Sequence, residues 1–213
     1  MRPRKLKLNE AQQNWVREWW RALQPRQEGD APLPGALSRM GRGERAQLRR
    51  CVNAEALLVH EATLLLAERL IALGGGMDIL PDEAYSYERL AWTAGVLAMV
   101  KTDIRDGKSL AWRLGHAAGE ERPKMSELRF KALQRSGAMV ELFRHWRRAV
   151  QLADAGTDVA RLADDLLAWQ ADLSQPLHRA SDGIKFYWAC DYYLTARQQV
   201  VAAGVESNKE TSA

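Results

Sequence analysis

The sequence has 213 residues, which favours one domain or two small helical lobes over a larger assembly of domains. Lys and Arg outnumber Asp and Glu by 31 to 27, and this net charge of +4 indicates less about function than the places where the arginines gather. Cys51 and Cys190 have no metal-ligand spacing, so a zinc site is disfavoured and a reducing, cytoplasmic setting is expected. No apolar run is long enough to span a membrane, and no apolar secretory core follows the basic start.

The first half of the chain has the periodicity of helices. A helix is expected from about residue 9 to 23, with Asn9 as its N-cap, and the Pro- and Gly-containing segment 24–40 should be irregular. A second helix begins near Gly43, and Asn53 should cap one longer helix that continues through Leu70. Residues 74–76 are all glycine and should end it.

The second half continues this pattern. Asp82 is expected to cap a helix that ends near Gly107, and Ser109 a short one through Ala118. Four more helices are expected: a short one from Ser126, a long amphipathic one after Gly137, another after Asp158, and a last one from about 182 to 203.

These patterns predict an all-α protein, because alternating strand-like runs are almost absent. We expect about eight to nine helices in an N-terminal lobe (1–107) and a C-terminal helical bundle (108–203), followed by a disordered tail (204–213).

Three basic groups are the strongest local signal, because a phosphate site needs several cations on one surface. In the second helix Arg42, Arg45 and Arg49 share a face by their spacing. The groups, with their neighbours, are Arg39, Arg42, Arg45, Arg49 and Arg50; Lys101, Arg105 and Lys108 at the expected end of a helix; and Arg122, Lys124, Arg129, Lys131, Arg135, Arg144, Arg147 and Arg148.

Charge pattern alone is equally compatible with ordinary solvated faces. No helix-turn-helix, zinc-finger or aromatic strand motif accompanies the cations, so base-specific readout is unsupported and backbone binding remains. The helical spacing of Phe143, Trp146, Trp169 and Tyr192 predicts core packing, whereas Trp112 is a candidate stacking surface beside basic residues.

Catalytic signatures are absent from the sequence. His60 and Glu61 lack the second histidine of a zinc protease, His116, His145 and His178 are isolated, and no phosphate-binding loop occurs. Asp164 and Asp165 are neighbours that point about 100 degrees apart on a helix, so they are interpreted as surface carboxylates. No cofactor or metal is expected.

Several longer stretches of the sequence are distinctive when they are taken together. They are WVREWWRAL from Trp15, GERAQLRRC from Gly43, KSLAWRLG from Lys108, MSELRFKALQRS from Met125, and then MVELFRHWRRAV, DVARLADDLLAW and FYWACDYY. In this order they resemble the CasB family, the small helical subunit of the type I-E CRISPR surveillance complex known as Cascade, and the resemblance covers most of the chain. SQPLHRASDGIK is longer than the family's usual connection, and the loop from Gly74 to Asp82 is peculiar to this sequence.

The resemblance implies a non-enzymatic subunit present as two copies packed head to tail, in contact with other Cascade subunits, CRISPR RNA and target DNA. It implies binding of nucleic acid without sequence preference, stabilisation of the R-loop, and contact with the displaced non-target strand. The residues it assigns to that role are Arg49, Arg50, Lys108, Arg113, Arg129, Arg135, Arg147 and Arg148, and helical spacing adds Arg42 and Arg45.

Two rival hypotheses remain open. One is a protein-only spacer whose basic faces meet acidic partner surfaces. The other is a metal-dependent nuclease that uses Asp164 or Asp165.

Overall fold

The computed structural model describes residues 4–26, 28–74, 79–81, 84–115, 122–175 and 179–194, and these residues are mostly helical. The helices are α1 (Glu10–Ala22), α2 (Arg42–Arg50), α3 (Ala54–Leu58), α4 (Glu61–Ala72), α5 (Ala84–Leu97), α6 (Leu110–Gly115), α7 (Glu127–Arg135), α8 (Met139–Leu152) and α9 (Val159–Ser174). Short 3-10 helices span Gly35–Arg39 and Ala180–Asp182, and residues 184–194 are helical. The all-α prediction is confirmed.

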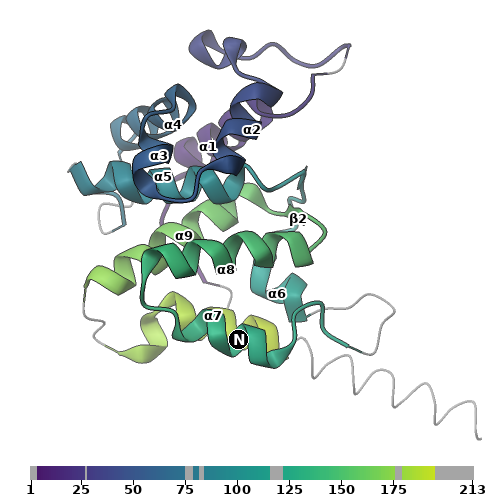
Figure 1. Cartoon of the computed structure of the whole chain (residues 1–213), viewed down its shortest axis with the longest axis vertical. Helices are drawn as coiled ribbons and strands as arrows, with labels where there is room; N and C mark the ends of the chain where they lie inside the picture. The colour runs from purple at the N-terminus through teal and green to yellow at the C-terminus, as the bar shows by residue number, and fades with distance from the viewer. Residues whose placement is uncertain are drawn as a thin grey trace, which may run out of the picture.

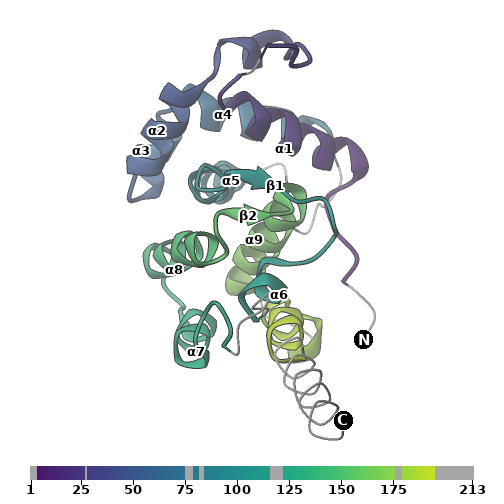
Figure 2. The same ribbon diagram turned by 90° about the vertical axis from the view of Figure 1, so that its right-hand side faces the viewer.

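The helices lie in three tiers (Figures 1 and 2). α1 to α4 gather at one end, α5, α8 and α9 lie in the middle, and α6, α7 and the helix of residues 184–194 lie at the other end. α5 packs against α2, α3, α4, α8 and α9, and α9 also packs against α1. The expected division after residue 107 stays a prediction, and the tail from 204 to 213 lies outside the described residues.

The middle tier is buried because its helices are apolar on most sides. Every residue of α5 from Arg89 to Leu97 is buried, and α9 is buried from Val159 to Ala171. Gly95 permits this packing, since a Cβ there would lie 2.8 Å from Cζ of Phe143. Edge-to-face contacts then run from Trp146 of α8 through Trp169 of α9 to Trp188, with centroid separations of 5.9 and 5.0 Å.

Several predicted helix starts are confirmed. The side chain of Asn9 accepts a hydrogen bond from the amide of Gln12, and those of Asn53 and Asp158 do the same at α3 and α9. The predicted core positions Phe143, Trp146, Trp169 and Tyr192 are at most 2% exposed. The predicted cap Asp82 lies outside the described residues.

Two predicted helix boundaries are wrong. The helix expected from Asn53 through Leu70 is divided at His60, which is the N-cap of α4. The helix expected to end near Gly107 ends at Leu97, and β1 (Thr102–Asp103) then pairs in parallel with β2 (Gly156–Thr157). The amides of Lys101 and Thr102 donate to the Ala155 carbonyl, so a segment about fifty residues away competes with continuation of the helix.

Candidate nucleic-acid interface

The end of α2 and the middle of α8 bring two of the predicted basic groups together. α2 ends at Arg50, and the chain then turns at Cys51 beside Arg147 of α8. Glu44, the acidic residue of α2, is held at the other end of the helix, where its carboxylate accepts a hydrogen bond from the amide of Gly41 at 2.8 Å. Cations from two distant parts of the sequence therefore meet here, and we call this region the α2–α8 junction.

Arg45 and Arg147 form the inner layer of the α2–α8 junction. Arg45 donates to the carbonyls of Ala98 and Val100 at 2.9 and 2.8 Å, and to Gln24. Arg147 donates to the Cys51 carbonyl at 2.9 Å and to the Arg49 carbonyl. These carbonyls lie in the last turn of α2 or just after the ends of α2 and α5, where cations are favoured by the helix dipole. Both side chains are half-buried and bind the chain's own backbone.

The inner layer could have been identified from the sequence by the positions of its arginines relative to apolar residues, which the charge pattern alone does not show. Arg45 lies three residues before Leu48, the buried residue of α2, and therefore on the inward face. Arg147 lies between buried Phe143 and Val150 on α8, and its guanidinium lies 5.0 Å from the Phe143 ring centroid. The spacing of Arg45 and Arg147 from buried apolar residues therefore distinguishes these two inward arginines from the exposed arginines beside them in sequence.

The outer layer of the α2–α8 junction is exposed and positive. Its side chains form no ion pair within the part of the chain that the structure describes. They are Arg49 and Arg50 of α2, and Arg144 and Arg148 of α8; Arg42, at the other end of α2, is also exposed without an ion pair among the described residues. Burial lowers the pKa values of Arg45 and Arg147, and the positive charge of Arg49 lowers both further. Like charges held this close raise the free energy of the empty site and favour an anion.

The second basic group lies in an extended segment instead of at a helix end, and it is partly neutralised, whereas Lys101 is exposed without an ion pair among the described residues. Arg105 pairs with Asp103 at 2.8 Å, and Arg113 pairs with Asp106 at 2.5 Å. Lys108 is exposed, with its ammonium 3.6 Å from the Trp112 ring centroid, as a cation–π contact requires. One face of the candidate stacking residue Trp112 is therefore covered by a lysine.

The third group divides between paired and unpaired cations. Lys124 pairs with Asp154, and Lys131 pairs with Glu127 one turn away at 2.6 Å. Exposed side chains without an ion pair among the described residues are Arg122, Arg129 and Arg135. α7 therefore carries a smaller uncompensated charge than the α2–α8 junction.

The surface interpretation of Asp164 and Asp165 is wrong, since both are at most 1% exposed. Asp164 accepts hydrogen bonds from Arg4 and from the amides of Lys7 and Leu8, the latter at 2.6 and 2.7 Å. Asp165 accepts from Arg4 at 2.6 Å and from the Trp188 indole at 2.9 Å. Through these hydrogen bonds the two carboxylates of α9 bind the N-terminal segment at residues 4–8 and the helix of residues 184–194.

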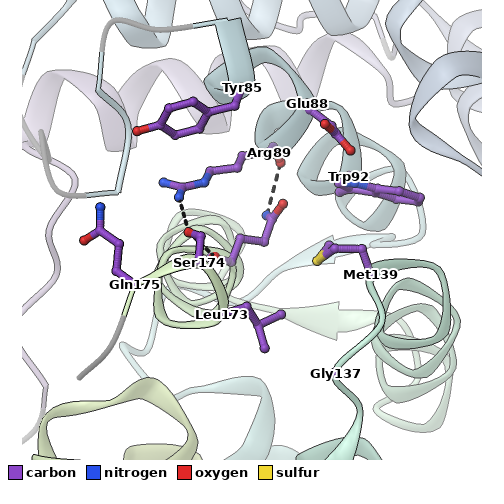
Figure 3. Close-up of a pocket in the computed structure, with 10 residues that line it drawn as sticks. Tyr85, Glu88, Arg89, Trp92, Gly137, Met139, Leu173, Ser174 and Gln175 are labelled. Atoms are coloured by element: carbon purple, nitrogen blue, oxygen red, sulfur yellow. Dashed lines mark hydrogen bonds between the residues drawn. The ribbon is translucent and has the colours of Figure 1, made fainter.

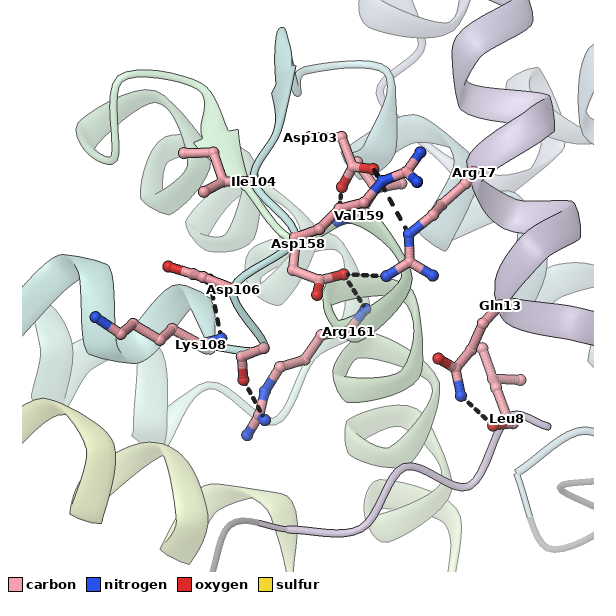
Figure 4. A network of polar contacts seen from close by, with 12 residues as sticks. Leu8, Gln13, Arg17, Asp103, Ile104, Asp106, Lys108, Asp158, Val159 and Arg161 are labelled. Atoms are coloured by element: carbon pink, nitrogen blue, oxygen red, sulfur yellow. Dashed lines mark hydrogen bonds and ion pairs between the residues drawn. The ribbon is translucent and has the colours of Figure 1, made fainter. Parts of the chain in front are cut away.

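Two further arginines that sequence reasoning did not single out complete this arrangement (Figure 4). Arg17 of α1 lies 2.9 Å from Asp158 and 3.5 Å from Asp103, so it joins α1 to α9 and β1. Arg161 donates to the Gly107 carbonyl at 2.6 Å and lies 3.8 Å from Asp191. We call Arg4, Arg17 and Arg161 with their carboxylates the paired seam.

Possible catalytic groups are dispersed. Cys51 Sγ lies 3.3 Å from His60 Nε2, and burial raises the pKa of this thiol. His145 lies beside Glu141 on α8 at 3.7 Å, and His116 and His178 lie outside the described residues. Within the described ranges, no three His, Cys, Asp or Glu side chains gather as a metal site would require, and no helix is long and apolar enough to cross a membrane.

Comparison with known proteins agrees with the arrangement of helices. A family model described as CRISPR-associated protein Cse2 matches residues 44–193. The crystal structure of CasB from Thermus thermophilus superimposes with a TM-score of 0.53 and 23% sequence identity, covering 85% of this chain and 97% of that one. No match was found among curated proteins. At this identity the structural likeness shows the fold, and the family match includes the α2–α8 junction from Glu44 onward.

Proposed function

Because the chain belongs to the CRISPR-associated Cse2/CasB family, the small subunit of the type I-E Cascade complex, we propose that it is a non-enzymatic subunit that holds nucleic-acid backbone. It acts in the cytoplasm beside a second copy of itself and other Cascade subunits. Its ligands are CRISPR RNA and target DNA, and its contacts with the displaced non-target strand stabilise the R-loop.

The α2–α8 junction is the observation that carries this proposal. Arg49, Arg50 and Arg148 are exposed and lack ion pairs among the described residues, while Arg45 and Arg147 fix the backbone beneath them. Guanidinium groups of this kind suit phosphate oxygens, which accept charge-assisted hydrogen bonds. Recognition of a base sequence needs side chains whose donors and acceptors match the edges of particular bases. The α2–α8 junction presents only cations, and cations favour contacts with the phosphate backbone.

The other predicted site residues enter the proposal in different roles. Arg45 and Arg147 position the α2–α8 junction, because their guanidinium groups already bind carbonyls. Lys108 lies beside Arg113, which is held by Asp106, so this pair adds less to phosphate affinity. Arg42, Arg129 and Arg135 are exposed and add positive charge at the start of α2 and on α7.

The test is binding of the purified protein to single-stranded DNA, duplex DNA and RNA across a salt series. The wild type is compared with Arg49→Ala/Arg50→Ala and with Lys108→Ala/Arg113→Ala. Binding that ignores sequence and weakens steeply with salt supports the proposal, provided that the first double variant flattens the slope by about 0.7–0.9 for each phosphate that the protein no longer neutralises. A weakening that depends on base sequence contradicts it.

A protein-only spacer is the second candidate, and exposed apolar side chains beside the α2–α8 junction favour it. Val52 and Val59, on either side of α3, are 67% and 78% exposed, as residues that meet a protein partner can be. This candidate predicts that the isolated subunit binds no nucleic acid even at low salt. It also predicts that charge reversal at Arg49 prevents assembly of the complex.

A further inference from the structure

A cavity of about 560 Å³ opens between α5, the end of α9 and the start of α8 (Figure 3), and no residue of the three basic groups lines it. Its volume lies within the range of pockets that hold ligands, roughly 300–1,000 Å³. Trp92, Met139 and Leu173 supply apolar surface, while Arg89 and Glu88 supply charges. The cavity therefore offers an apolar group a place beside a cation.

Arg89 is the unusual member of this wall. The residue is 7% exposed, and its guanidinium donates to the Ile79 carbonyl at 2.8 Å and to Ser174 Oγ at 2.6 Å. Since a guanidinium carries five N–H bonds, three have no acceptor among the described residues. The Tyr85 ring lies 4.8 Å from the guanidinium carbon, and burial lowers the pKa of Arg89.

The other strongly buried arginines show what Arg89 lacks. Arg4 faces Asp164 and Asp165, and Arg161 faces Asp191. Arg89 forms no ion pair in the described part of the chain, and the end of α9 offers it only the partial negative charge of a helix terminus. A buried cation without a counter-ion is costly, so a carboxylate entering the cavity would offset that cost.

The rim of the cavity indicates what kind of carboxylate enters. Tyr85 is 39% exposed, and Glu88 and Gln175 are exposed as well, so an occupant remains partly in solvent. Such an open depression fits side chains of a docked protein better than an enclosed small molecule. Glu88 lies on the Trp92 side (Figure 3) and repels a carboxylate there, which directs the acid towards Arg89.

We propose that this pocket docks a peptide segment of a partner protein, with an apolar side chain against Trp92, Met139 and Leu173 and an adjacent Asp or Glu on Arg89. The contact is independent of nucleic acid, because none of the residues that line the pocket belongs to the α2–α8 junction. It adds a protein-binding site to the nucleic-acid surface of the same subunit.

The test titrates the full chain with two capped dipeptides, acetyl-Phe-Asp-amide and acetyl-Phe-Asn-amide, and with 3-phenylpropionate. The ¹³C-methyl signal of Met139, assigned with Met139→Leu, reports on the cavity. The Asp dipeptide should bind at least about tenfold more tightly than the Asn dipeptide, because hydrogen bonds between charged groups are about twice as strong as neutral ones. Arg89→Gln should abolish this preference, and Arg89→Lys should retain part of it.

Leu173→Trp fills the cavity while Arg89 is retained, so it should remove binding of both dipeptides even where Arg89 variants fold poorly. Equal binding of the two dipeptides by the wild type overturns the proposal, as does no binding of either. Tighter binding of 3-phenylpropionate than of the Asp dipeptide overturns the assignment to a peptide. Self-association that Leu173→Trp abolishes would instead identify a second copy as the occupant.

Discussion

The paired seam and the α2–α8 junction use arginine in opposite ways. In the paired seam, Arg4 and Arg17 contact carboxylates that lie more than eighty residues away in sequence. In the α2–α8 junction, Arg49 is exposed without a carboxylate among its described neighbours, and its charge lowers the pKa of Arg147. The arginines of the first region join helices, and those of the second remain available.

The difference shows that the role of an arginine depends on its partners in the folded structure and not on how many basic residues are near it in sequence. Arg17 and Arg161 lie outside the dense basic runs and are structural. Within one dense run, Arg147 binds the chain's own carbonyls while the neighbouring Arg148 is exposed. Buried charges that have partners hold a fold together, whereas exposed charges without partners cost little and remain free for a ligand.

The largest effect should follow from breaking the paired seam. Arg4→Ala leaves Asp164 and Asp165 buried without their shared cation, which should lower the free energy of unfolding by about 3–5 kcal/mol. Urea denaturation measures this change. Lys5→Ala, which removes an exposed neighbouring cation, should stay within about 0.5 kcal/mol. A decrease below about 1 kcal/mol for Arg4→Ala would mean that the carboxylates find other partners.

The buried hydrogen bond of an uncharged tyrosine, Tyr192, gives a comparison with the charged paired seam at high pH. Tyr192 donates to the Met125 carbonyl at 2.6 Å, and burial, aided by Tyr193 and Glu127, raises the pKa of Tyr192 to about 12. The unfolded chain loses this proton near pH 10, so the folded state binds more protons between about pH 10 and 12. Stability should therefore fall with rising pH there, by about 1.4 kcal/mol per unit from this group.

Denaturation of the wild type and of Tyr192→Phe at pH 9 and pH 11 isolates that contribution. Phenylalanine cannot ionise, so the stability of the variant should fall less than that of the wild type between the two pH values. Parallel decreases in the two proteins would place the Tyr192 hydroxyl in contact with water.

Two adjacent arginines of α8 provide a smaller and more direct comparison. Arg147→Ala removes the hydrogen bonds to the Cys51 and Arg49 carbonyls and should reduce stability by about 1–2 kcal/mol. Arg148→Ala should leave stability unchanged within about 0.5 kcal/mol and weaken nucleic-acid binding. Thermal unfolding and a binding titration on both variants check this division, which fails if both variants show the same pair of effects.

Much of the fold follows from local sequence signals. Side-chain caps at Asn9, Asn53 and Asp158 fix helix starts through atoms only three residues away, so the sequence displays them directly. The apolar spacing of α8 and α9 similarly places Trp146 and Trp169 in the core. The exposed basic residues of the α2–α8 junction could be chosen from spacing alone, while their meeting across α2 and α8 could not.

Two of the failures share one physical cause, which is a partner far away in sequence. Asp164 and Asp165 look like surface carboxylates because the cation that neutralises them, Arg4, lies 160 residues earlier than Asp164. The end of α5 at Leu97 depends on hydrogen bonds between segment 101–104 and segment 155–157. Local helix propensity cannot predict such contacts. Tertiary hydrogen bonds and ion pairs decide both the burial of the two aspartates and the end of α5.

The central claim is that uncompensated arginines hold phosphate while paired ones do not, and matched charge removals test it directly. Arg49→Ala and Arg105→Ala each remove one exposed arginine, but only Arg105 has a carboxylate partner, Asp103 at 2.8 Å. Binding to single-stranded DNA is measured from low to physiological salt. We expect Arg49→Ala to flatten the logarithmic salt slope by about 0.7 and Arg105→Ala to leave it unchanged. Equal slopes for the two variants would contradict the claim.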